Sequence, residues 1–144
     1  MNKLFGAVCA ALLVMPAIAM AEDMGCNDVN FGDEVLAAFP KIREACQGVT
    51  MKDGKAYVQL KAEVVAKDKD TLTVHMMDRQ NKPISEIKVA PGAEDRANVE
   101  GKDTKFKDLQ KGQDLSVYLE HDRWGLYSSL DQSNMMKIVS RKEL

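Results

Sequence analysis

Hydrophobic and polar side chains alternate along two runs, residues 58–64 and 71–76, and this pattern limits the possible folds more than any other feature of the chain. Apolar residues occupy every second position of 58–64 and of 72–76, with polar residues between them. A period of two places alternate side chains on opposite faces of an extended strand. The polar turn Lys67-Asp68-Lys69-Asp70 separates the two runs. The pattern therefore predicts a hairpin of two half-buried antiparallel strands.

Further short runs of the same type follow the hairpin. The clearest is 115–119, where Leu115, Val117 and Leu119 alternate with polar residues. Weaker runs lie at 84–89, around 99, at 104–106, at 124–127 and at 136–139. Five to seven short antiparallel strands are typical of a small barrel or sandwich. We therefore expect a mainly β fold, with a small antiparallel β-barrel formed by residues 55–144.

A helical arm precedes the strands, in residues 22–54. Apolar residues at 35, 36, 39 and 42 have helical spacing, and Asn30 or Asp33 is placed to cap the start. Pro40 is incompatible with the interior of a straight helix. The arm is therefore expected to contain two short helices, or one helix kinked at Pro40.

The first 21 residues have the organisation of a secretory signal peptide. Lys3 is followed by an apolar stretch from Leu4 to Val14, by Pro16 and by the small-residue site Ala19-Met20-Ala21. The apolar stretch is too short to span a bilayer, and Glu22 and Asp23 follow directly. We therefore expect cleavage after residue 21 and an exported protein that does not span the membrane. The absence of an Asn-x-Ser/Thr acceptor favours a bacterial periplasm.

Cleavage would leave two of the three cysteines. Cys9 lies in the leader, whereas Cys26 and Cys46 lie in the arm. Two cysteines in an oxidising compartment most simply form a disulfide, and closing a loop of about 20 residues stabilises a fold by roughly 3 kcal/mol. A redox couple would usually have closer spacing, and a metal pair would need further ligands nearby. We predict a structural Cys26–Cys46 disulfide.

The chain resembles small exported proteobacterial proteins of uncharacterised function. The resemblance is carried by residues 29–31, 34–37, 39–40, 42–43, 45–46 and 53–54. The stretch 106–115 is similar to a turn-and-strand element of small secreted barrels. The resemblance implies an OB-like or SH3-like barrel, and it carries over no catalytic residue.

Neither an enzyme nor a nucleic-acid-binding protein is indicated. Nucleophile-elbow, phosphate-loop, dinucleotide-binding and zinc-protease motifs are all missing from the sequence, which has two histidines. Glu120-His121-Asp122 is interpreted as a charged turn if the strand ends there, because neighbours on a strand point to opposite faces. The formal net charge of −2 opposes nucleic-acid binding. We predict a non-enzymatic protein.

His75 and Met77 form a possible soft-metal site. Their spacing places them on one face of a strand, opposite the apolar Val74 and Met76. Imidazole and thioether ligands together suit Cu(I) or Ag(I). In ligand types and compartment the chain is similar to small periplasmic copper- and silver-binding barrels, although the order and spacing of the ligands differ. A surface histidine and core methionines are the structural alternative.

Four aromatic residues provide the remaining candidate, a binding surface made of Tyr57, Tyr118, Trp124 and Tyr127. Aromatic residues are common interface anchors, and their alternative role is core packing with the polar tip at the rim. We therefore expect an exported binding module for a protein or a cell-envelope component. A soft-metal (copper or silver) protein that uses His75 and Met77 is the alternative. The sequence does not define the oligomeric state.

Overall fold

A computed structural model describes residues 24–92, 94–131 and 135–144, so the predicted signal peptide lies outside the described residues. The fold is mainly β, as expected, with eight strands in one antiparallel sheet and two short α-helices. Among the described residues, no helix is long and apolar enough to cross a membrane. The strands are β1 (Cys46–Lys52), β2 (Lys55–Lys67), β3 (Leu72–Met77), β4 (Pro83–Ala90), β5 (Arg96–Val99), β6 (Lys102–Lys105), β7 (Asp114–Glu120) and β8 (Lys137–Glu143).

The helical arm consists of two short helices, α1 (Asp33–Ala38) and α2 (Ile42–Ala45). Pro40 lies in the break between them, which agrees with the first of the two expected arrangements. Neither of the expected caps is used: Gly32 occupies the N-cap position of α1 and has no side chain to donate or accept a bond. The buried side chains of Val35, Phe39 and Ile42 attach the arm to the core.

A disulfide joins Cys26 to Cys46, as predicted. Cys26 begins a short 3-10 helix, η1 (Cys26–Asp28), and Cys46 is the first residue of β1. The bridge therefore ties the start of the arm to the sheet across 20 residues of sequence. Strand β1 itself was not expected, because Gly48 interrupts its alternation and leaves only the four residues from Val49 to Lys52 in phase.

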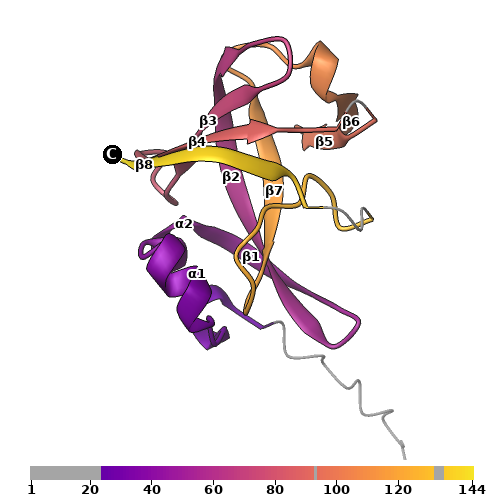
Figure 1. The fold of residues 1–144 in the computed structure, drawn as a ribbon. Coiled ribbons are helices and arrows are strands. Elements are labelled where there is room, and N and C mark those ends of the chain that lie inside the picture. Colours follow the sequence, from indigo (N-terminus) through magenta and orange to yellow (C-terminus); the bar gives the residue numbers. More distant parts are fainter. Residues whose placement is uncertain (1–23, 93, 132–134) are drawn as a thin grey trace, which may run out of the picture.

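Strand β2 is the centre of the sheet. The strand order is β6-β5-β7-β2-β3-β4-β8, with β1 paired to β2 outside that path (Figure 1). One edge of β2 pairs with β7 over residues 57–63, and its other edge is divided between β1 over 55–60 and β3 over 62–67. Strand β2 is therefore hydrogen-bonded to three other strands. It needs its 13 residues because two of these strands share one of its edges.

The segment after β7 connects the two branches of the sheet. Tyr127 forms an antiparallel bridge with Tyr118 of β7, and Leu126 forms one with Met136, the residue before β8. This short ladder brings the start of β8, which otherwise pairs with β4, back toward β7. In the pairing of the named strands, β6 and β8 remain the two ends of the sheet.

One hydrophobic core unites the arm and the sheet. Alternate residues of β2, from Val58 to Val64, are fully buried, and the residues between them are partly exposed. Val117 and Leu119 of β7 pair with Leu60 and Val58 and are also buried. The sequence period of two is thus the period of burial. Leu36 on α1 is one of the few large apolar side chains left exposed.

Replacing both Cys26 and Cys46 by serine should lower the free energy of unfolding by about 3 kcal/mol, because the unfolded chain regains the freedom of the 20-residue loop. Urea unfolding of the wild-type protein and the double variant measures this difference. A thiol assay on denatured, unreduced wild-type protein is the control and should detect neither cysteine. An unchanged free energy of unfolding would contradict the stabilising role of the disulfide.

Candidate functional site

Three of the four aromatic candidates lie together on the side of β2 and β7 that faces away from the core. Gln59 of β2 pairs with Tyr118 of β7, and Tyr118 pairs in turn with Tyr127. Tyr57 pairs with Glu120 at the end of β7. Residues that pair across an antiparallel sheet project from the same face. We call this surface, formed by Tyr57, Gln59, Tyr118, Glu120 and Tyr127, the tyrosine face.

The tyrosine face is joined by one ring contact and by main-chain hydrogen bonds. The rings of Tyr57 and Tyr127 meet edge to face, with 6.0 Å between their centroids. The main chains of Tyr118 and Tyr127 exchange two hydrogen bonds of 2.8 Å. Tyr127 is buried, whereas Tyr57 and Tyr118 remain partly exposed. The face therefore exposes parts of Tyr57 and Tyr118 to solvent, and Tyr127 is buried beside them.

Trp124, the fourth aromatic candidate, packs elsewhere. Its ring meets Phe39 edge to face at 6.3 Å, and it packs against the hydrophobic core. Phe39 is fully buried at the end of α1. Trp124 therefore helps to hold the helical arm on the sheet, which is the core-packing alternative considered for these aromatic residues.

Glu120 is a buried carboxylate at the edge of the tyrosine face. It is only 4% exposed, and the ammonium group of Lys55 donates a hydrogen bond to its Oε1. Lys55 itself is half exposed, so the ion pair lies where the protein interior meets solvent. The hydrogen bond and the charge of Glu120 raise the pKa of Lys55. Burial, followed by the charge of Glu120, raises the pKa of Tyr57.

The turn after β7 connects this carboxylate to the helical arm. Strand β7 ends at Glu120, so Glu120-His121-Asp122 does run into a charged turn. A hydrogen bond with Glu120 lowers the pKa of Asp122, and the charges of His121 and Lys55 lower it further against the opposing effect of burial. Nδ1 of His121 lies 3.0 Å from the carbonyl oxygen of Asn30. The turn therefore contacts both the tyrosine face and the arm.

Gly32 allows the arm to approach this turn closely. Its N–H donates a 2.8 Å hydrogen bond to the carbonyl of His121. A Cβ atom at this position would lie 3.0 Å from the Cα of Asp122, which is closer than side chains normally pack against main chain. A glycine is therefore needed here for its small size.

The sequence alone did not predict that Glu120 is buried. Alternation in β7 places Glu120 with Ser116 and Tyr118 on the polar face, and such positions are normally in contact with solvent. The chain after β7 folds back beside this face, where Tyr127 contacts Tyr57 and the ammonium of Lys52 donates to the carbonyl of Leu130. These contacts are non-local, so no pattern within the strand could reveal them.

His75 and Met77, the soft-metal candidates, have different surroundings. Nε2 of His75 lies 3.1 Å from Oε2 of Glu86 on β4, which leaves Nδ1 for any other partner. Met77 is buried, and the pairing of β3 with β4 shifts register between Met76 and Met77. The simple alternation that would place both ligands on one face is therefore interrupted. Among the described residues no group of three or more His, Cys, Asp or Glu side chains could hold a metal ion.

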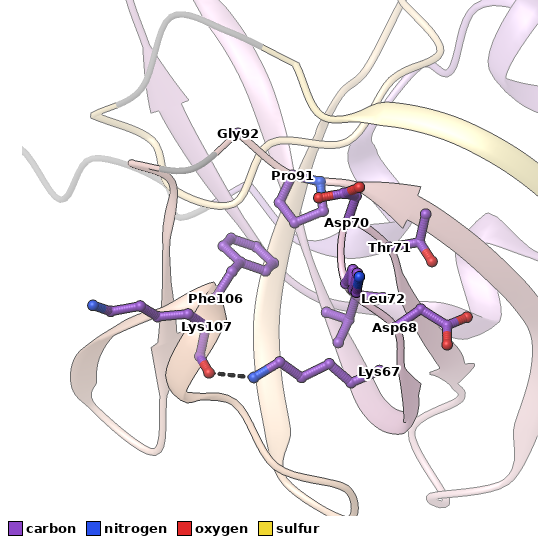
Figure 2. A pocket seen from close by; sticks show the side chains of 10 residues that line it. Lys67, Asp68, Asp70, Thr71, Leu72, Pro91, Gly92, Phe106 and Lys107 are labelled. Atoms are coloured by element: carbon purple, nitrogen blue, oxygen red, sulfur yellow. Dashed lines mark hydrogen bonds between the residues drawn. The ribbon is translucent and has the colours of Figure 1, made fainter.

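A pocket of about 280 Å³ lies at the end of the sheet where β2 turns into β3 (Figure 2). Leu72, Pro91 and Phe106 contribute its apolar lining, and charged side chains of the turn surround it. The ammonium of Lys67 is already used, because it donates to the carbonyls of Lys107 and Leu109. None of the site residues predicted from the sequence lines this pocket.

Comparison with known protein families, with curated proteins and with solved structures finds no match to this chain. The candidate site is therefore defined by the residues and contacts of this structure alone.

Tyr57 should ionise above its ordinary pKa of 10.0, and Glu120→Gln should shift its titration to lower pH by removing a nearby negative charge. Because the pKa is raised in the folded state, folding stability should fall as the pH rises through 10 toward the folded value. Tyrosinate absorbance measures the titration, and Tyr57→Phe identifies the signal. Glu86→Gln, a remote carboxylate variant, should leave it unchanged; equal shifts in both variants would contradict the assignment.

Titration with Cu(I) tests the soft-metal interpretation, which stays a prediction. We expect weak binding of Cu(I), because one of the two ligands is held by Glu86 and the other is buried. Competition with a Cu(I) chelator measures the affinity of the purified mature protein. Tight stoichiometric binding that is lost in His75→Ala and in Met77→Leu would contradict this expectation and support a soft-metal protein.

Proposed function

We propose that this protein is an exported, non-enzymatic binding module that takes a protein or a cell-envelope component on its tyrosine face. The observation that carries the proposal is the grouping of Tyr57, Tyr118 and Tyr127 on the side of the sheet that the core does not use. Core packing accounts for Trp124, whereas Tyr57 and Tyr118 remain partly exposed beside the buried Tyr127. Aromatic side chains held in place outside a core are well suited to bind a ligand.

The polar groups around the rings support the same proposal. Nε2 of Gln59 donates to Oγ of Ser116 at 3.1 Å, and Nζ of Lys61 lies 3.4 Å from the carboxylate of Asp114. These side chains continue the tyrosine face along β2 and β7. A row of paired polar groups beside partly exposed rings offers hydrogen bonds along an extended ligand and apolar contact at one end.

Export to the periplasm is part of the proposal. The organisation of residues 1–21 as a signal peptide and the Cys26–Cys46 disulfide both support it, because disulfides persist in oxidising compartments. We further propose that the bridges of Tyr127 and Leu126 curl the sheet toward an OB-like or SH3-like barrel, the fold implied by the sequence resemblance. Small barrels of this type often bind ligands through one strand face.

Substitution of the exposed rings tests the proposed binding face. The purified mature protein is presented with two probes, peptidoglycan sacculi and a detergent extract of envelope proteins, and bound material is quantified. Tyr57→Ser and Tyr118→Ser should each weaken binding about tenfold, because aromatic anchors commonly contribute more than 1 kcal/mol. The sacculi distinguish a polymer ligand from a protein ligand.

Val139→Ser is the matched control. Val139 lies on β8 and is half exposed, so its substitution removes apolar surface without touching the tyrosine face. Circular dichroism should confirm that all three variants are folded. Equal binding by the wild-type protein and both tyrosine variants would refute the proposed face, as would the failure of both probes to bind.

A further inference from the structure

In the part of the chain that the structure describes, three strands of the sheet have an edge that pairs with no other strand, and these strands differ in charge. Strands β6 and β8 end the sheet, and β1 pairs only with β2 among the described residues. Natural proteins commonly protect such edges with charged side chains. Strand β6 carries Lys102, Asp103 and Lys105, and β8 carries Lys137, Arg141, Lys142 and Glu143. Strand β1 has no charged residue before Lys52.

The part of β1 from Gly48 to Lys52 is a regular strand, and no described strand pairs with its outer edge. The register of β1 against β2 shifts once, between Cys46 and Gly48, and then runs without interruption to Lys52. The short helix η1 lies against β1, joined to it by the disulfide at Cys46. The β1–β2 hairpin turn lies at the opposite end of the molecule from β5 and β6 (Figure 1).

The side chains of this segment before Lys52 are uncharged and partly apolar. Met51 is 52% exposed, the largest value among the exposed large hydrophobic residues of the described chain. Val49 lies on the same side of the strand and is partly buried against the core. Thr50 is exposed and pairs with Tyr57, so it extends the tyrosine face. The ammonium of Lys52 bonds to the carbonyl of Leu130.

We propose that β1 pairs with β1 of a second copy of this chain, in an antiparallel arrangement centred on Thr50. This pairing places Thr50 opposite Thr50, Val49 opposite Met51, and Gly48 opposite Lys52. No charge meets a like charge, and Met51 of each copy lies opposite Val49 of the other. Threonine pairs and apolar pairs are favourable across antiparallel strands.

A second copy fits this edge because the segment is complementary to itself. A two-fold dimer uses the same surface on both subunits, so every favourable pair away from the axis occurs twice. The main-chain groups of each β1 edge gain partners, and the two sheets become continuous. Because one short strand buries a small area, we expect a weak dimer that forms at high protein concentration. This pairing of β1 does not depend on what the tyrosine face binds.

Charge substitution at the two-fold axis provides the test. Sedimentation equilibrium of the mature wild-type protein should show the mass rising from monomer to dimer as the concentration increases. Thr50→Lys should remain monomeric, because two ammonium groups would face each other across the axis, and Thr50→Glu should remain monomeric for the same reason. An equimolar mixture of the two variants should recover the dimer mass, because Lys and Glu are then opposite each other.

Val139→Lys on the β8 edge is the matched control and should dimerise like the wild-type protein. A wild-type mass that stays monomeric at every concentration would overturn the proposal. Dimers that persist in both Thr50→Lys and Thr50→Glu would also overturn it, because the interface would then lie elsewhere. Circular dichroism of each variant separates loss of association from loss of folding.

Discussion

The structure depends on one long strand, β2, that bonds to three others. Its 13 residues pair with β7 on one edge and with β1 and then β3 on the other. Each of these pairings fixes which face of its partner is buried, because a shift of one residue would exchange the two faces. The strict alternation from Val58 to Val64 therefore sets the core for four strands at once. The helical arm then covers the apolar side through Phe39 and Ile42.

The chain that follows β7 packs against the opposite side of β2. Tyr127 returns to pair with Tyr118 and to pack on Tyr57, and Glu120 becomes a buried partner of Lys55. The adjoining turn contacts the arm, where Gly32 donates to the carbonyl of His121. The arm, which is tied to β1 by the disulfide, is thus coupled to the edge of the tyrosine face. Both meet at the turn that follows β7.

The two proposed interaction surfaces share a boundary at β1. Thr50 is the residue of β1 that pairs with Tyr57, so the tyrosine face continues to the free edge of the sheet. A two-fold axis through Thr50, perpendicular to the joined sheet, would place the tyrosine faces of both copies on the same side. Two weak binding faces presented together bind a repetitive or extended ligand more tightly than either alone.

The sequence by itself determined the hairpin of β2 and β3, the strand at 115–119, the break at Pro40 and the Cys26–Cys46 pair, because each depends on local periodicity, on proline geometry or on the count of cysteines. Strand β1 was missed, since Gly48 interrupts it and the alternation from Val49 to Lys52 is too short to predict a strand. Only the tertiary structure separated Trp124 from the three tyrosines and buried Glu120. Those outcomes depend on contacts between residues distant in sequence, such as Phe39 with Trp124 and Lys55 with Glu120. A local sequence pattern cannot predict such contacts, because it depends only on neighbouring residues.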